Sequence, residues 1–373
     1  MYRYLMIATC VIAFAFQGWR TLYNNFAVDE VGLNALQNGV VQSIREVPGF
    51  LSLFVVYLLL LMKEHRVGLY SVALFGLSVC LVGYLDSFVG LIVTTFLLST
   101  GMHFFETCNK SLVLQYFDRQ QAPLVLAKQF SYKAITNVSV GIVMFFLCKW
   151  NLPYTILFTV LGIVVLGAVI YLSTLNPVKP LLTKQRTSMV FKRKYWLFYV
   201  VNFLSGARRQ IFVVFAVFIL VQRYHYSVML VIGLFVVNNI ISFFISPVIG
   251  RMINRYSERH VLLAEYTAML LVFSGYAFVD NAVVVGLLYL VDNIFYPCSM
   301  AINTYFQKIG DPEDIAPSMA MGFTINHISA VVIPVMGGAL WVLDYRIPFI
   351  LAIFLSLCSL FFVNKMKPVD SLN

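Results

Sequence analysis

The sequence is poor in charged side chains, which make up 11% of its 373 residues, whereas hydrophobic residues make up 61%. A typical soluble domain carries about 25% charged residues, so this composition excludes an ordinary soluble protein. The six cysteines have no Cys-x-x-Cys spacing, so neither a metal site nor a disulfide framework is indicated. The sequence also lacks a Gly-x-x-x-x-Gly-Lys-Ser/Thr segment and any nucleophile–base constellation. We therefore expect no ATP hydrolysis, no enzymatic activity and no cofactor.

Long hydrophobic runs are abundant, and many reach the length of about 20 residues that spans a bilayer. They predict an all-α membrane protein with twelve transmembrane helices, at residues 4–28, 36–61, 68–86, 88–116, 123–148, 153–174, 195–221, 227–249, 260–279, 282–306, 315–341 and 347–365. The longest interruption contains proline and is basic. It predicts an N-terminal six-helix bundle at 1–174, a cytoplasmic central loop at 175–194 and a C-terminal six-helix bundle at 195–373.

Lys and Arg residues gather on one side of the predicted helices. If the N-terminus is cytoplasmic, sixteen of those near the helix ends lie on the cytoplasmic side and three, Lys149, Arg223 and Arg346, lie opposite. Cytoplasmic loops carry such an excess, which places both termini in the cytoplasm. The first run lacks a small-residue cleavage site, so we expect it to remain as a membrane helix. Because topology explains the net charge of +10, that charge does not indicate nucleic-acid binding.

The two halves of the chain align as repeats at a single offset of 189 residues. This offset pairs Arg20 with Arg209 on the first predicted helix of each half. It also pairs Arg66 with Arg255 in a loop and Asn137 with Asn326 on the fifth helix. Several matches at one offset predict two pseudo-symmetric bundles.

The loop between the eighth and ninth predicted helices carries a short motif made of Gly250, Asn254, Arg255, Ser257 and, nearby, Arg259. The loop between the second and third helices carries a degenerate copy of this motif. Arg66 and Gly68 match it, whereas Leu61 and His65 occupy the other two positions. Together with the repeat and the basic central loop, these residues resemble the major facilitator superfamily. That family has Gly-x-x-x-Asp-Arg-x-Gly-Arg in the first loop and an echo in the second. Physically, the motif is expected to be a structural latch, because Gly250 permits close helix approach and the arginines lie at helix C-termini.

The resemblance implies two bundles related by an axis along the membrane normal, which transport a substrate by alternating access. It also implies a monomer in the bacterial inner membrane, with the first, fourth, seventh and tenth helices lining a central cavity. The arginine that is usual in the fourth helix of the family is absent here. A standard sugar-porter or drug–proton-antiporter mechanism therefore does not carry over.

Charged residues inside the predicted helices are costly, at about 2.5–3.5 kcal/mol each by insertion scales, and they mark polar paths. The cations are Arg20, Arg45, Lys110, Lys128, Lys133, Arg208 and Arg209, and the acids are Glu46, Glu106, Glu265 and Asp292. Except for Glu265, near the start of the ninth helix, all fall on helices that line or flank the cavity in the resembled family. The cations outnumber the acids, which predicts a negatively charged substrate.

Arg20 and Arg209 are expected to face each other as an anion clamp, because guanidinium groups bind carboxylate or phosphate with two hydrogen bonds. Their placement is similar to that of the arginines in organophosphate antiporters of the family. The alternative for Arg20 is that it reaches the membrane interface. The predicted substrate-binding residues are Arg20, Arg209, Arg208, Arg45, Lys133, Asn137 and Asn326. The predicted coupling or gating residues are Glu46, Glu106, Lys110, Asp292 and His327.

Spacing suggests partners for some of these charges. Glu106 and Lys110 lie four residues apart and are expected to pair, either as a structural ion pair or as a gate. Arg45 and Glu46 are adjacent and are expected to point in different directions, just before a helix bend at Pro48. Arg208 lies about 100° around the helix from Arg209 and is expected to face Asp292 or Glu46.

The sequence thus favours a secondary active transporter for a small organic or phosphorylated anion, driven by protons or by exchange. One alternative is an exporter of an amphipathic or polycarboxylate compound, such as a drug or a siderophore. The other is a receptor or assembly protein that does not transport. The direction of transport and the identity of the substrate are not specified by the sequence.

Overall fold

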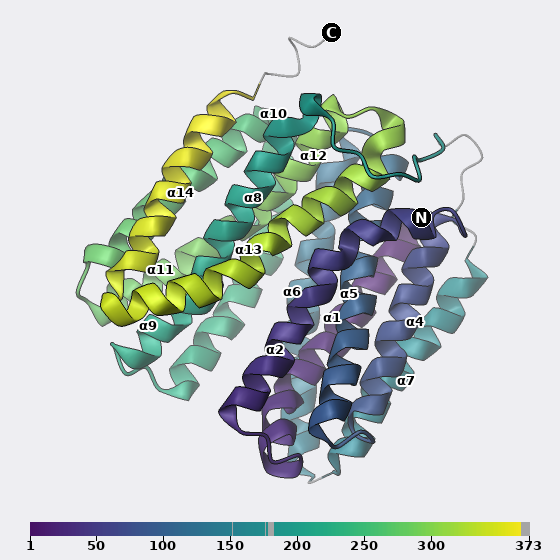
Figure 1. The fold of residues 1–373 in the computed structure, drawn as a ribbon, viewed down its shortest axis with the longest axis vertical. Coiled ribbons are helices and arrows are strands. Elements are labelled where there is room, and N and C mark those ends of the chain that lie inside the picture. The colour runs from purple at the N-terminus through teal and green to yellow at the C-terminus, as the bar shows by residue number, and fades with distance from the viewer. Residues whose placement is uncertain (151, 176, 178–182, 367–373) are drawn as a thin grey trace. The chain divides into compact units, whose positions relative to one another are not determined.

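The computed structural model describes residues 1–150, 152–175, 177 and 183–366, which form helices and loops without a β-strand (Figure 1). Part of the predicted central loop, at 176 and 178–182, lies outside the described residues. So do Lys179 and Lys367, two of the cations that were counted for the orientation. The all-α prediction is confirmed for the described part of the chain.

The chain divides into two compact units whose sequences are partly interleaved. The first unit comprises Met1–Tyr116, Tyr132–Met189 and Glu313–Ala320, and the second comprises Phe117–Ser131, Val190–Pro312 and Met321–Asn373. Two long helices, α6 (Gln121–Lys149) and α13 (Ile315–Leu343), therefore begin in one unit and continue in the other. The bundle boundaries expected from the sequence stay a prediction.

The first unit is built around α4, which packs against α5 and α7. Its other helices include α1, α2 and the short α3, and α2 packs against α5. Their bounds are α1 Tyr2–Asn25, α2 Ala35–Phe50, α3 Val55–Leu58, α4 Glu64–Val82, α5 Phe88–Tyr116 and α7 Tyr154–Thr174. A Cβ atom at Gly162 of α7 would lie 2.5 Å from the carbonyl oxygen of Gly76 on α4. Small residues here let the two backbones approach closely, as is common between membrane helices.

The second unit is built around α10, which packs against α14 and α11. The bounds are α8 Trp196–Ile211, α9 Val217–Gln222, α10 Val228–Phe278, α11 Ala282–Phe295, α12 Met300–Ile309 and α14 Arg346–Asn364. Aromatic side chains fill its core, where the rings of Tyr276 and Phe349 stack 5.0 Å apart and those of Phe212 and Tyr289 stack 5.2 Å apart.

Ten helices within the described residues are long and apolar enough to cross a membrane. One of them covers Met229–Phe278, and α10 is interrupted there at Ser257, whose backbone is non-helical with φ at 73°. This break separates two helical parts that correspond to the eighth and ninth predicted helices. The helix α6 is 29 residues long but is not among the ten. The chain is thus an integral multi-pass membrane protein, and the count of twelve helices stays a prediction.

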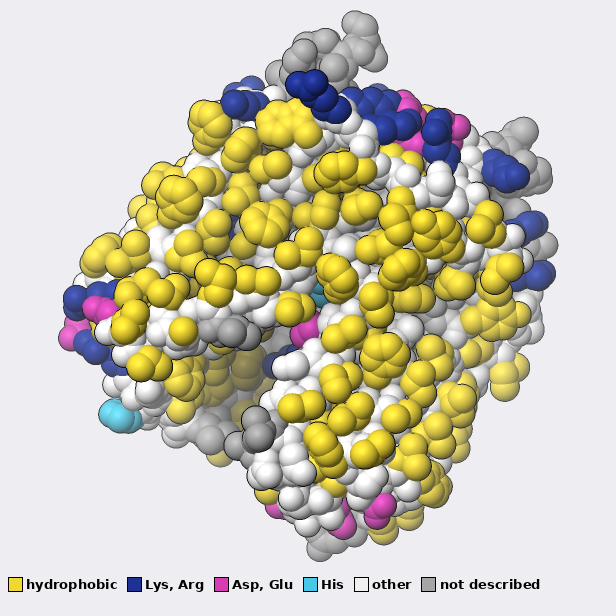
Figure 2. Space-filling model, viewed as in Figure 1, with side chains coloured by type: hydrophobic (Ala, Val, Ile, Leu, Met, Phe, Trp, Pro, Cys, Tyr) yellow, Lys and Arg dark blue, Asp and Glu magenta, His cyan; other side chains and the backbone are white. Residues whose placement is uncertain are grey.

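Hydrophobic side chains cover most of the face seen in Figure 2, and Lys and Arg side chains gather toward the helix ends. This distribution suits helices whose sides contact lipid tails and whose ends contact water.

Irregular turns interrupt helices close to the intramembrane charges. A π-helical turn follows α1 at Phe26–Glu30, and another follows α8 at Phe212–Ala216. Both come shortly after the repeat-related Arg20 and Arg209. The helix α2 contains Pro48, which has no N–H to donate to the helical ladder, and it changes to a 3-10 turn shortly afterwards, at Leu51–Phe54.

Candidate functional site

Arg209 lies near the end of α8 and forms an ion pair with Asp292 of α11, with 2.9 Å between Nη1 and Oδ1. The guanidinium carbon also lies 4.0 Å from the ring centre of Tyr296 and 4.8 Å from that of Phe212. The Arg209 side chain is 30% exposed, whereas that of Asp292 is 5% exposed. The arginine is thus the accessible member of this pair, and the carboxylate is the buried member.

Arg208 forms a second ion pair, with Glu265 of α10, at 2.6 Å between Nη2 and Oε1. Both side chains are sealed from solvent, at 4% and 5% exposure, and the guanidinium lies over the ring of Tyr266. The remaining atoms Nη1 of Arg208 and Oε2 of Glu265 are buried without a hydrogen-bond partner. Unsatisfied atoms of this kind are expensive inside a protein, so this pair is held in place by the surrounding packing.

The prediction that Arg208 faces Asp292 or Glu46 is wrong, because its partner is Glu265. The turn of about 100° between neighbours on a helix directs Arg208 toward α10 and Arg209 toward α11. Glu265 was not predicted to belong to the candidate site, because it lies near the start of the ninth predicted helix. One feature of the sequence did point to it: Glu265 is the only acid in the interior of the four predicted helices that were expected on the outside of the bundles.

In the first unit, Arg45 and Glu46 of α2 form an ion pair at 2.8 Å between Nη2 and Oε1. The prediction that these neighbours point apart is therefore wrong. The Arg45 side chain is long enough to fold across the helix surface, and its Nε also donates to the same oxygen at 3.2 Å.

Glu106 of α5 forms an ion pair with Lys133 of α6, at 3.4 Å between Oε1 and Nζ. The sequence paired Glu106 with Lys110, one helical turn away, and missed this contact between helices. Asn137 follows Lys133 by one turn of α6, and Arg20 is exposed near the end of α1. The structure thus brings Lys133, predicted to bind substrate, together with Glu106, predicted to gate.

Asn326 and His327 lie on α13, where it crosses α8 at close range. The Asn326 amide donates to the carbonyl of Asn202 at 3.2 Å, and a Cβ atom at Gly206 would lie 2.5 Å from the Asn326 carbonyl oxygen. The His327 ring stacks on Phe323, and its Nδ1 lies 2.9 Å from the Phe323 carbonyl oxygen. These contacts hold both side chains in place.

The loop motif of the second half lies against the start of α6. The Asn254 amide donates to the carbonyl of Gln120 at 2.7 Å, and a Cβ atom at Gly250 would lie 2.9 Å from the Pro123 carbonyl oxygen. Arg259 donates to the Asn364 side chain at 3.2 Å, and Arg255 lies over the ring of Tyr256. In the degenerate copy of the motif in the first half, Arg66 is exposed and Gly68 packs against the hydroxyl of Tyr4.

Each of the four acids within the predicted helices thus forms an ion pair with one cation, from among Arg45, Lys133, Arg208 and Arg209. The seven cations still exceed the four acids by three formal charges.

The family model described as the Major Facilitator Superfamily matches residues 5–334 of the chain. No curated protein sequence matches the chain. Among solved structures, that of FucP, a transporter of the same superfamily in the outward conformation, is similar with a TM-score of 0.77 and 14% identity over 98% of both chains.

Two further similar structures have equally low identity. The human organic anion transporter MFSD10 has a TM-score of 0.75 and 11% identity, over 97% of this chain and 98% of the other. A bacterial homologue of the iron transporter ferroportin in an outward-facing state has a TM-score of 0.77 and 12% identity, over 98% of both chains. Identities this low establish the shared fold and not the substrate.

Proposed function

Because this chain belongs to the major facilitator superfamily of membrane transporters, we propose that it is a secondary transporter for a small organic or phosphorylated anion. Two six-helix bundles would alternate between conformations open to either side of the membrane, with both termini in the cytoplasm. The substrate would move with a proton or in exchange for another anion.

The observation that carries this proposal is the exposure of the Arg209 side chain together with its contacts. Its side chain is 30% exposed, its guanidinium carbon lies 4.0 Å and 4.8 Å from the ring centres of Tyr296 and Phe212, and it pairs with a buried carboxylate. A guanidinium stays charged at physiological pH and binds carboxylate or phosphate through two parallel hydrogen bonds. The rings of Tyr296 and Phe212 hold it in one orientation, which favours a ligand of fixed geometry.

The balance of charge supports the same conclusion. The cations within the predicted helices outnumber the acids by seven to four. We propose that this excess of positive charge favours the binding of an anion. Arg20, which the repeat pairs with Arg209, would provide the second half of the clamp.

We propose that the Arg209–Asp292 pair couples transport to protons. A bound anion would compete with Asp292 for the guanidinium, and a carboxylate that is buried without a counter-charge is strongly destabilised. Asp292 would then take up one proton from water, and anion and proton would cross the membrane together. The further residues proposed to bind substrate or to gate are Arg208, Arg45, Lys133, Asn137, Asn326, Glu46, Glu106, Lys110 and His327.

Uptake into proteoliposomes tests the anion site. We expect wild-type protein to take up radiolabelled inorganic phosphate or one of a set of short mono- and dicarboxylates. We expect Arg209→Gln to reduce the initial rate about 100-fold, since the lost charge-assisted contacts are worth about 2–3 kcal/mol. The matched control is Arg223→Gln, which removes an arginine of the second unit that pairs with Asp280 beyond the helix ends.

Unchanged uptake in Arg209→Gln would overturn the proposed site. Export of cationic dyes without uptake of any anion would favour the exporter, and the aromatic rings beside Arg209 suit such compounds. Absence of any flux, with stable binding of a partner protein, would favour the receptor.

The proton step has its own variant. We expect Asp292→Asn to lose uptake driven by a pH gradient while it keeps exchange of labelled for unlabelled anion, because the amide cannot take up the proton. Acidification of the vesicle lumen, followed with a pH-sensitive dye, measures the difference. Equal pH-driven uptake in Asp292→Asn and wild type would exclude Asp292 as the proton acceptor.

A further inference from the structure

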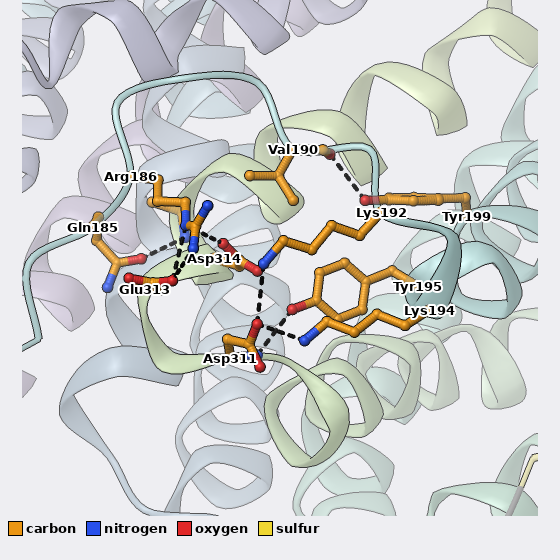
Figure 3. A network of polar contacts seen from close by, with 11 residues as sticks. Gln185, Arg186, Val190, Lys192, Lys194, Tyr195, Tyr199, Asp311, Glu313 and Asp314 are labelled. Atoms are coloured by element: carbon orange, nitrogen blue, oxygen red, sulfur yellow. Dashed lines mark hydrogen bonds and ion pairs between the residues drawn. The ribbon is translucent and has the colours of Figure 1, made fainter.

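The linker between the two halves is tied to the acidic turn that precedes α13 (Figure 3). The Asp311 carboxylate accepts hydrogen bonds from Lys192, at 3.0 Å, and from Lys194. The backbone N–H of Asp311 donates to the hydroxyl of Tyr195 at 3.0 Å, and Tyr195 is fully buried. The linker end of the second unit thus holds the turn through both side chain and backbone.

An adjacent part of the linker holds the first turn of α13, and this contact lies within the first unit (Figure 3). The Arg186 guanidinium pairs with Glu313 and, at 2.9 Å, with the fully buried Asp314. The backbone N–H of Arg186 donates to the Glu313 carbonyl at 2.9 Å. The side-chain oxygen of Gln185 accepts from the backbone N–H of Ala316 at 2.9 Å, so it caps one of the N–H groups that a helix start leaves unpaired.

The corresponding helix of the first half begins differently. At the start of α6, the helix caps itself, because Asp118 accepts from the backbone N–H groups of Gln120 and Gln121. The loop motif adds the contact from Asn254 to Gln120. For α13, the motif copy in the first half is degenerate, and its Gly68 packs against the hydroxyl of Tyr4. The start of α13 is thus held by the linker, whereas the start of α6 is capped by Asp118 and contacted by the loop motif.

We propose that linker residues Gln185–Tyr195 act as a clasp on the segment Asp311–Ala316, and that opening of this clasp is a step in the conformational change of the transporter. The clasp is expected to open during this change because α13 is divided between the two units. Residues Glu313–Ala320 belong to the first unit, whereas the helix continues into the second unit from Met321. Any movement of one unit against the other must bend α13 near this point or release its first turns. The clasp resists release, and this role does not depend on which substrate is carried.

Hydrogen exchange of the full-length protein in lipid nanodiscs tests the first part of the proposal. We expect Arg186→Gln to speed amide exchange in the peptide that covers residues 313–320 about tenfold, because its first turn loses contacts to Glu313 and Asp314. Gln185→Ala removes a single cap and is expected to speed exchange about threefold. The matched control, Lys184→Gln, changes an exposed cation of the same linker and should leave the exchange rate unchanged.

Spin-label distances between one site in each unit test the second part, without any added substrate. We expect Arg186→Gln to change the relative populations of the distance classes, and we expect Lys184→Gln to retain those of the wild type. Exchange in Arg186→Gln that equals the control would overturn the clasp. Faster exchange with unchanged distance populations would overturn its link to the conformational change. Should Arg186→Gln fail to fold, Gln185→Ala decides both points.

Discussion

Of the ion pairs described above among the predicted membrane helices, two lie in each unit, and the two sets differ in their exposure to solvent. In the first unit, Arg45 and Glu46 are 28% and 24% exposed, and Lys133 and Glu106 are 45% and 30% exposed. In the second unit, Arg208 and Glu265 are sealed, and only Arg209 of the neighbouring pair reaches a surface. Ion pairs of the same residue types are thus partly exposed and able to rearrange in the first unit, but buried and held in place in the second.

The difference shows that the two halves have diverged in the use of their charges. Exposed pairs exchange partners with water or ligand at little cost, since such pairs contribute about 0–1 kcal/mol. A sealed pair cannot exchange its partner for water, because both ions have lost their hydration. We infer that the second unit fixes the position of Arg209, while the pairs of the first unit adapt.

The largest expected effect comes from breaking the sealed pair. Arg208→Gln leaves Glu265 buried without its ion-pair partner, so we expect the free energy of unfolding to fall by about 3–5 kcal/mol. Unfolding by denaturant in detergent micelles, followed by circular dichroism, measures this loss. The double variant Arg208→Met, Glu265→Leu should regain most of it, because two apolar side chains need no partner.

Stability of Arg208→Gln within 1 kcal/mol of the wild type would remove the distinction between the two units. A double variant as unstable as the single one would show that packing around Tyr266, and not charge, sets the cost.

The fold was more predictable from the sequence than these partners were. Hydrophobic runs, loop cations and the 189-residue repeat depend on periodicity, which survives when individual residues change. The partners of Arg208 and Arg45 depend on where helices distant in sequence pack and on how long side chains bend. No spacing along one helix contains that information. The interleaving of α6 and α13 between the units was not predictable for the same reason.

A smaller effect is expected in the first unit. Lys133→Gln leaves Glu106 partly exposed, so water solvates the carboxylate and the free energy of unfolding should fall by less than about 1 kcal/mol. The same unfolding assay, run beside Arg208→Gln, compares the two units directly. A loss from Lys133→Gln as large as that from Arg208→Gln would mean that the Lys133–Glu106 pair is as tightly held as the sealed one.

The smallest effect is expected for an exposed cluster in the second unit. Because this cluster is exposed and yet belongs to the second unit, it shows whether burial or the choice of unit determines how tightly an ion pair is held. The hydrogen bonds from Lys194 and Lys192 hold the pKa of the Asp311 carboxyl well below its usual value near 4. Its stabilising contribution is therefore complete above about pH 4 and is lost as the pH falls from there toward the lowered pKa.

A spin label at the exposed Ser188 of the linker reports this loss as increased mobility. We expect the label to be immobile from pH 7 to about pH 4 and to become mobile below it, while global unfolding is unaffected. In Asp311→Asn, the label should be mobile throughout, since the amide carries no charge for Lys192 and Lys194 to bind. If mobility instead rose near pH 6, or if acid unfolded the whole unit together with the linker, this exposed cluster would be behaving like a buried pair. Depth would then no longer explain why the charges of the two units differ.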